Sequence, residues 1–238
     1  MGTDDIDADN EALEFGLAQP FYIDEHPQHR LTLPTFLIDQ FEVTRADYQR
    51  FVQSTGHAAP EDWVNGRFAP ERAFHPVVFV SWYDANDYCH WDGKRLLTEP
   101  EWEKAARGPD GLKYPWGNEL IPERANISSG ASLFGDSVPV GRYQAGKSPY
   151  GAQDLIGNVW EWTDSWYSTY PGNPDADKVD KFGRGLRVTR GLSFMSVGHY
   201  PKDTYRHVLS ILARASFRSY DVPTSRLADV GFRCARSE

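Results

Sequence analysis

The sequence predicts a single α+β domain, rich in loops and short strands, over residues 1–238. Three helix signals fall in the first half of the chain, and turn-rich segments with many tryptophans follow them. No internal repeat or low-complexity linker separates the two parts, so one domain is the economical interpretation. Eight Trp, 20 Gly and 16 Pro are typical of an irregular fold in which indole rings fill a core organised by few long elements.

The charge balance limits the partners. Lys plus Arg number 25 against 34 Asp plus Glu, a formal net charge of −9. Nucleic acids and anionic membrane surfaces require clustered cations, so neither is expected as the main partner. No apolar run reaches the length of a membrane span, and the first residues lack the basic start and apolar stretch of a secretory signal.

The first elements follow from local patterns. Leu31–Phe41 is rich in strand-forming residues. Thr44 is suited to cap a helix in which Tyr48 and Phe51 share one face, and Gly56 marks its end.

The next two segments show the same signals, an apolar run followed by a helix cap. His75–Val80 is a short apolar run that predicts a strand. Ser81 then caps a second helix, with Ala85, Tyr88 and Cys89 on one stripe.

The third helix has the strongest signal in the chain. Thr98 is the predicted N-cap, Glu101 its capping-box partner, Pro100 lies in the first turn and Gly108 stops the helix. Beyond it we expect loops and short strands, including a strand at Leu186–Thr189, and an ambiguous helical patch around 204–213.

Two acids in the segment DLIGNVWEW attract attention as metal ligands. Asp154 and Glu161 are separated by a Gly-Asn turn that can point backbone carbonyls inward, and Ca²⁺ prefers such oxygen ligands. The residues alone favour the simpler interpretation, a turn with two solvated acids. The two cysteines, Cys89 and Cys234, are equally open: they are two buried thiols or one long-range disulfide.

Four blocks now stand in a fixed order along the chain. They are TFLIDQFEVTRADYQRFV; PVVFVSWYDANDYCHWDGKRLLTEPEWEKAARG with YPWGN; GAQDLIGNVWEWTDSWY; and RVTRGLSF with GFRCA. In this order the chain resembles the formylglycine-generating-enzyme, or sulfatase-modifying-factor, family. The resemblance implies a C-type-lectin-like domain with little regular secondary structure.

The resemblance also implies where the family's chemistry would lie. The family oxidises a cysteine of a sulfatase peptide with dioxygen and a copper ion held by two cysteines. Aligning its GGS motif with Gly191-Leu192-Ser193 places these cysteines at Ser196 and Pro201. Neither position can supply a thiolate for Cu(I), so formylglycine generation is not expected.

Structural features are implied in the same way. Calcium would be held by two sets of residues: Asp154, Glu161 and the carbonyls of Gly157 and Val159; and Asn126, Asp136 and the carbonyls of Ile127 and Val138. Cys89 and Cys234 match positions that pair as a disulfide in the vertebrate family member. The resemblance begins at Met1, so a processed signal or trimmed start and a periplasmic or secreted location are expected, with a cytoplasmic location as the alternative.

The stretch RGLSFMSVGHYP should form the floor of a pocket. Trp160, Ser193 and Arg218 match residues at the family's pocket, and Ser196, His199 and Tyr200 are candidate catalytic residues. The neighbouring aromatic and imidazole groups are His199, Tyr200, Tyr205 and His207. Lining a ligand groove is the role we expect for them; a redox metal such as non-haem iron with Asp203, acid–base chemistry and a Ser196–His199 nucleophile are the alternatives.

Two functions compete. The first is cysteine-independent oxidative maturation of a peptide or peptide-derived small molecule, as in the family member that completes the pyoverdine chromophore. The second is a non-catalytic, calcium-stabilised peptide- or ligand-binding module, like the vertebrate paralogue without the cysteines. Polar, redox-compatible side chains and additional histidines favour the first.

Overall fold

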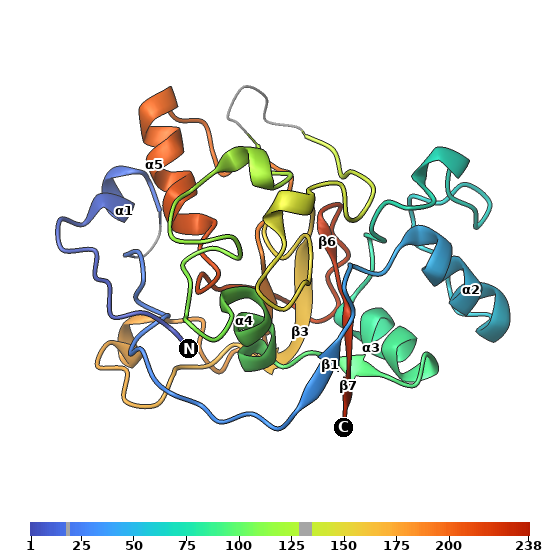
Figure 1. Ribbon diagram of the computed structural model, residues 1–238, viewed down its shortest axis with the longest axis horizontal. Helices are drawn as coiled ribbons and strands as arrows, with labels where there is room; N and C mark the ends of the chain where they lie inside the picture. The colour runs from blue at the N-terminus through green and yellow to red at the C-terminus, as the bar shows by residue number, and fades with distance from the viewer. Residues whose placement is uncertain (18–19, 129–134) are drawn as a thin grey trace.

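The computed structural model describes residues 1–17, 20–128 and 135–238 (Figure 1). The α-helices are α1 (Glu11–Glu14), α2 (Arg45–Thr55), α3 (Trp82–Trp91), α4 (Glu99–Arg107) and α5 (Lys202–Leu212). The strands are β1 (Phe36–Ile38), β2 (Arg95–Leu96), β3 (Trp160–Trp166), β4 (Arg187–Arg190), β5 (Ser219–Asp221), β6 (Val230–Gly231) and β7 (Cys234–Ser237). Short 3₁₀ turns are η1 (Pro70–Arg72), η2 (Pro122–Arg124), η3 (Gln144–Gly146) and η4 (Ala176–Lys178). Short elements joined by long loops confirm the α+β prediction.

The strands form two sheets. One has the order β1-β7-β2 and is antiparallel, and the other has the order β5-β4-β3-β6. In the second sheet β4 is antiparallel to β3 with Arg190 opposite Glu161, whereas β6 is parallel to β3 with Val230 opposite Trp160. The end of β4 and the start of β6 therefore flank the same end of β3. This topology brings together the loops that follow β4 and precede β6.

The three predicted helix starts are confirmed. Thr44 and Ser81 cap α2 and α3, and each side chain accepts a hydrogen bond from the backbone N–H three residues later. Thr98 is the N-cap of α4, and the Glu101 carboxylate accepts from its N–H at 2.8 Å. Local capping chemistry thus fixed the starts of these helices, as the sequence indicated.

The predicted strand at His75–Val80 is wrong. The run is extended and largely buried, yet its one ladder contact is an isolated bridge between Pro76 and Thr44. Phe79 adopts a left-handed conformation, with φ of 58°, and its N–H donates to the Leu227 carbonyl. A positive φ breaks the pleat of a strand, so these apolar residues fill the core as irregular chain.

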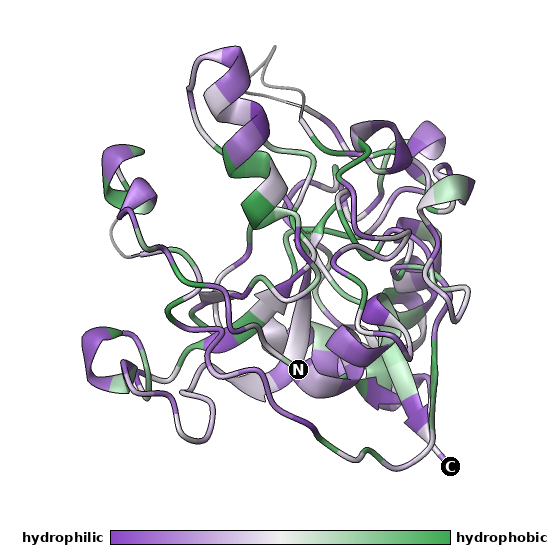
Figure 2. Ribbon diagram, turned by 60° about the vertical axis from the view of Figure 1, so that its left-hand side comes forward, coloured by the Kyte–Doolittle hydropathy of each residue, from purple (hydrophilic) through white to green (hydrophobic). Residues whose placement is uncertain are grey.

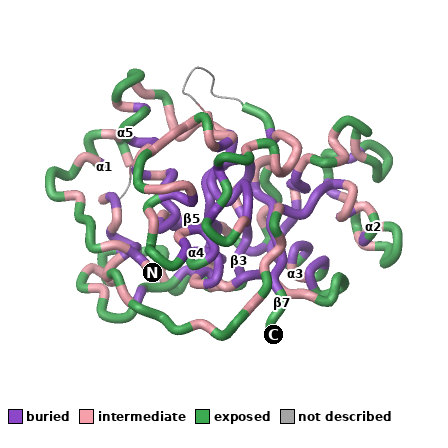
Figure 3. Tube along the Cα trace, viewed as in Figure 1, coloured by how far each residue is buried: buried purple, intermediate pink, exposed green. Residues whose placement is uncertain are grey.

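The core runs through the middle of the molecule, and the outer loops are exposed (Figure 3). One apolar cluster joins α2 and α3 to the Cys89–Cys234 region, and another joins α4 to α5. The ambiguous patch is helical, as α5, with apolar residues gathered toward the C-terminal end where the helix meets the body of the molecule (Figure 2). In Figure 1, α1 and α5 lie on the left and α2 and α3 on the right. Among the described residues, no helix has the length and apolar character needed to cross a membrane.

Candidate functional site

A serine and an aspartate meet beside the first residues of β3. Gly191 and Leu192, which follow β4, have positive φ values of 104° and 64°. A Cβ on Gly191 would lie 2.8 Å from the Leu155 carbonyl oxygen, so this turn requires glycine. The next residue, Ser193, is buried and donates its hydroxyl to Asp229 Oδ2 at 2.7 Å. The predicted pocket residue Ser193 therefore has an acidic partner.

Asp229 is held just before β6. Its carbonyl accepts the Trp160 N–H at 2.8 Å, which ties the predicted residue Trp160 to the same place. Burial raises the pKa of the Asp229 carboxyl, while the Ser193 hydroxyl acts in the opposite direction. Among the described residues no Arg or Lys pairs with Asp229. A desolvated carboxylate without a cation is suited to accept a proton.

Apolar and aromatic residues adjoin this pair along the chain and through the Trp160 backbone. Phe194 packs with Val159, and Met195 lies against the same cluster. The rings of Trp160 and Phe217 lie 6.2 Å apart. The Ser193–Asp229 pair thus combines one basic carboxylate with an apolar setting, the combination expected of a proton-transfer or ligand-binding site. The name "Ser193–Asp229 site" refers below to these two residues with Trp160.

The hydrogen bonds given below for the candidate catalytic residues go to partners other than Ser193 and Asp229. Ser196 donates its hydroxyl to the Gly198 carbonyl at 2.8 Å, a local turn within the loop. His199 is exposed. Tyr200 donates its hydroxyl to the Phe15 carbonyl at 3.1 Å, and the two rings pack edge to face. Tyr200 therefore anchors the chain around α1, and catalytic roles for these three residues stay predictions.

The other two members of the histidine–tyrosine cluster also form contacts between segments. Tyr205 is buried and donates to the Ser128 carbonyl at 3.2 Å, whereas His207 pairs with Glu11 at 2.9 Å on the surface. Among the described residues, no three carboxylate, imidazole or thiol groups converge so that they could hold a metal ion. The iron site with Asp203 therefore has no support in the geometry.

Arg218 lies in a buried ion-pair cluster. Its guanidinium donates to both oxygens of Glu99 at 2.7 and 3.0 Å and to the Asp24 carbonyl at 2.7 Å. The members of this buried ion-pair cluster are Glu25, Glu99, Glu103, Arg190, Arg214 and Arg218. All of these side chains are nearly inaccessible to solvent. Arg218 therefore lies inside the protein and pairs with a buried carboxylate, which corrects the expectation that it flanks a pocket.

The first predicted calcium set is only partly assembled. Both oxygens of Glu161 accept from Arg233, at 2.7 and 2.8 Å, and Trp102 adds an indole N–H at 2.9 Å. Asp154 accepts the Gly141 N–H at 2.6 Å. Glu161 is therefore committed to an ion pair, and the residues do not fit a set in which it is a free ligand.

A third acid, Glu42, adds to this region. Its carboxylate accepts from the Asn158 amide at 2.7 Å and from the Val159 N–H at 3.3 Å. Burial, followed by the charges of Asp154 and Glu161, raises its pKa well above the ordinary value. Three acids thus share one buried cation, Arg233, and this excess of negative charge is what a divalent cation near Asp154 would offset. Calcium at this loop stays a prediction.

The second predicted set is arranged around Asn158. The Asn126 amide donates to the Asp136 carbonyl at 3.0 Å, and Asn158 Oδ1 accepts from the Val138 N–H at 2.9 Å. The Asp136 carboxylate forms a two-point ion pair with Arg72. These hydrogen bonds hold the loop together, but the carboxylate of Asp136, like that of Glu161, already forms an ion pair with an arginine.

Sequence reasoning missed Asp229, Glu42 and Asn158. Asp229 stands directly before Val230-Gly231-Phe232, two residues ahead of the start of the GFRCA block. An acid that directly precedes a run of apolar residues was its signal. The two hollows that we describe are lined by residues of α2 and α3 and by residues near β1 and β7, and the pocket expected beside Ser196 stays a prediction.

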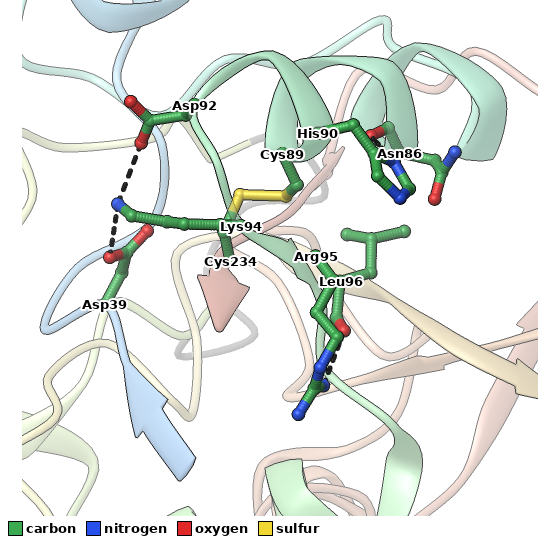
Figure 4. Close-up of a disulfide and its surroundings, with 9 residues drawn as sticks. All are labelled: Asp39, Asn86, Cys89, His90, Asp92, Lys94, Arg95, Leu96 and Cys234. Carbon is green, nitrogen blue, oxygen red and sulfur yellow. Dashed lines mark hydrogen bonds and ion pairs between the residues drawn. A yellow bond between two sulfur atoms is a disulfide. The ribbon is translucent and has the colours of Figure 1, made fainter. Parts of the chain in front are cut away.

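The predicted cysteine pair is confirmed. Cys89 on α3 and Cys234 at the start of β7 form a disulfide with Cα atoms 5.7 Å apart (Figure 4). Both are fully buried and lie in the same apolar cluster. Lys94, close to the disulfide, bridges Asp39 and Asp92.

Comparison with known proteins defines the class to which this fold and site belong. Residues 4–238 match the family model described as the sulfatase-modifying factor enzyme 1-like domain. The chain therefore belongs to the formylglycine-generating-enzyme-like family.

Individual relatives differ in what their names say. The formylglycine-generating enzyme of Mus musculus is 33% identical, with 99% of this chain and 72% of that protein covered. The inactive C-alpha-formylglycine-generating enzyme 2 of the same species is 34% identical, with 90% and 79% covered. The structure of PvdO from Pseudomonas aeruginosa matches with a TM-score of 0.68 at 24% identity, with 100% of this chain and 90% of that one covered, and this likeness concerns the fold. Identity therefore does not separate an enzyme from an inactive relative, and the site must do so.

Proposed function

We propose that the chain is a cysteine-independent oxidative maturation factor that acts on a peptide or a peptide-derived small molecule at the Ser193–Asp229 site. The observation that carries this proposal is the carboxylate of Asp229. It is hydrogen-bonded to Ser193, desolvated enough to raise its pKa, and free of an arginine partner among the described residues. Such a group removes a proton from a substrate without a metal ion.

The positions aligned with the family's copper ligands support the same proposal. Ser196 and Pro201 provide no soft ligand, and the Ser196 hydroxyl is used within its own loop. Chemistry at this site must therefore depend on the substrate's own electrons and on proton transfer by the protein.

The proposed step is balanced with dioxygen as the oxidant. Asp229 accepts a proton from an O–H or N–H group of an electron-rich substrate, and the resulting anion gives two electrons to dioxygen. The substrate loses two hydrogens in total, the second as a proton, and forms a new C=O, C=N or C=C bond. Dioxygen takes up two electrons and two protons and leaves as hydrogen peroxide.

The test measures dioxygen consumption and peroxide formation with peptides that carry a phenol or catechol side chain. Asp229→Asn keeps the size of the side chain and its ability to accept from Ser193, but it removes the base. A loss of rate by about 10²–10⁴-fold is expected, as for other general bases. Asp110→Asn, at an exposed acid, changes the net charge equally and should leave the rate unchanged.

Two outcomes would overturn the proposal. If Asp229→Asn retains the parent rate, the carboxylate is not the base. If the parent protein binds such peptides in a calorimeter without consuming dioxygen, the chain is a binding module.

Location and calcium stay predictions that accompany this function. Disulfides persist in oxidising compartments, so the Cys89–Cys234 bond supports the expectation of a periplasmic or secreted setting. Intact mass of protein isolated from its native compartment tests this: two free thiols would contradict it.

A further inference from the structure

A hollow of about 630 Å³ lies on the surface formed by α2 and α3. These helices are on the opposite side of the molecule from α1 and α5 (Figure 1). The residues that line the hollow are Phe51, Thr55, Gly56, His57, Asp87, His90 and Trp91. Neither the Ser193–Asp229 site nor the family's copper positions contribute to it.

The hydrogen bonds of the two histidines fix which ring nitrogens remain available. His57 Nε2 lies 2.9 Å from Asp84 Oδ1, and a carboxylate can only accept, so Nε2 carries the proton. His90 Nδ1 lies 2.8 Å from the Asn86 carbonyl, so there Nδ1 carries the proton (Figure 4). In the neutral rings, His57 Nδ1 and His90 Nε2 are therefore both acceptors.

Asp84 is ionised, which supports this assignment for His57. Burial disfavours its charge, yet hydrogen bonds from Ser81 and His57 and the charge of Arg226 lower its pKa. Arg226 lies 2.8 Å from Asp84 Oδ2.

The remaining polar group in the hollow is the exposed carboxylate of Asp87, a third acceptor. Beside these groups lies the indole of Trp91, 40% exposed, with its ring 5.6 Å from Phe51 and 5.7 Å from Tyr88. An indole face attracts cations through its quadrupole. The lining of the hollow thus includes three acceptor groups and an aromatic side chain, on a protein whose net charge is −9.

We propose that this hollow binds a primary ammonium group, and specifically the side chain of a lysine in a peptide partner. An alkylammonium has three N–H donors and no acceptor, which matches the two imidazole nitrogens and one carboxylate. Its methylene chain packs against Phe51 and Trp91.

The test follows the indole N–H signal of Trp91 by NMR during titration with defined probes. The probes are n-butylammonium, its neutral analogue 1-butanol, methylguanidinium, and blocked tripeptides with lysine or norleucine at the centre. The lysine peptide and n-butylammonium should shift the signal at millimolar concentration, and 1-butanol and the norleucine peptide should not. Trp91→Phe identifies the signal.

Two substitutions test which side chains contribute to binding of the lysine peptide. Asp87→Asn should weaken lysine-peptide binding by up to about fivefold, the range for an exposed ion pair. Trp91→Leu should weaken it by about two- to fivefold through loss of the cation–π contact. Asp110→Asn is the matched control and should leave the affinity unchanged.

The contrary outcomes are distinct. Equal binding of the neutral and cationic probes would show an apolar hollow, and preference for methylguanidinium would assign it to arginine. Binding of n-butylammonium without the lysine peptide would assign it to a free amine, and no shift with any probe would remove the site. Each of these results overturns the proposal, and none depends on oxidative activity.

Discussion

Two regions of this protein provide their acids with different partners. In the buried ion-pair cluster each carboxylate has an arginine: Glu25 pairs with Arg214, Glu103 with Arg190, and Glu99 with Arg190 and Arg218. In the Ser193–Asp229 site the carboxylate has a hydroxyl and no cation among the described residues. Asp229 is also partly exposed, whereas the acids of the cluster are nearly inaccessible to solvent, so the two regions differ in both compensation and burial.

The difference teaches where chemistry can occur. A buried carboxylate paired with an arginine belongs to the fold, and removing its partner is strongly destabilising because it leaves a buried charge uncompensated. An unpaired, desolvated carboxylate has a raised pKa and can exchange a proton with a ligand. The partners of these acids, and not their number, are therefore the basis of the proposed function at Asp229.

The largest effect is expected in the ion-pair cluster. Arg214→Met removes a guanidinium that donates to both oxygens of Glu25, at 2.6 and 2.8 Å, and leaves a buried charge unpaired. We expect the free energy of unfolding to fall by about 3–5 kcal/mol, measured by urea denaturation at neutral pH.

The double variant Glu25→Leu with Arg214→Met is the control for this prediction. It removes both charges, so most of the lost stability should return. If the single and double variants are equally unstable, packing and not charge compensation explains the loss.

Calcium should have the next largest effect, because it would compensate acids that have too few cations. At a hundredfold excess over its dissociation constant, a ligand of the folded state adds about 2.7 kcal/mol to stability. We expect calcium to raise the melting temperature of the parent protein, and Asp154→Ala to lose most of this rise. Asp136→Ala should lose less, since Asp136 already pairs with Arg72. Melting that is indifferent to both calcium and a chelator would contradict the prediction.

Glu42 allows the same idea to be tested by pH. Its folded-state pKa is raised well above 4.5, first by burial and then by Asp154 and Glu161. The neutral form is therefore favoured by folding: the contribution to stability is full below the unfolded pKa and is lost as pH rises through the folded one. Glu42→Gln should be more stable than the parent at neutral pH by at least about 1 kcal/mol, which is less than one pKa unit. The gain should shrink toward acid pH in chelator-treated protein, and a gain that does not vary with pH would show that charge is not its cause.

The smallest effect on stability is expected at Ser193. Ser193→Ala removes one hydrogen bond to Asp229 and should cost about 1 kcal/mol. The Ser193 hydroxyl lowers the pKa of Asp229, so its loss raises that pKa further. The pH dependence of activity should shift its acid limb to higher pH, or the Asp229 carboxyl signal should titrate later by NMR. If the titration of Asp229 is the same in Ser193→Ala and the parent, Ser193 does not influence the pKa of Asp229.

Much of the fold was predictable because it depends on neighbours in sequence. Thr44, Ser81 and Thr98 begin helices by bonding to residues three positions away, and these starts are confirmed. The cysteine pairing was not of this kind: it came from the family resemblance, since 145 residues separate Cys89 from Cys234.

The failures have a different physical origin. The strand expected at His75–Val80 was lost because Phe79 adopts a left-handed conformation and bonds to Leu227, a residue far away in the chain. Arg218 was placed at a pocket, although its surroundings are the carboxylate of Glu99 and the carbonyl of Asp24. Neither contact can be recognised from the residues that are adjacent in the sequence.

The sequence by itself determined the α+β class, the helix starts, and, through its ordered motifs, the family and the missing copper ligands at Ser196 and Pro201. Only the tertiary structure decided which acids are compensated. Ser193 and Asp229 are 36 residues apart, and they meet because β4 and β6 flank the same end of β3. A carboxylate's pKa depends on the dielectric and charges within a few ångströms of it, and those neighbours are set by strand pairing and not by position along the chain.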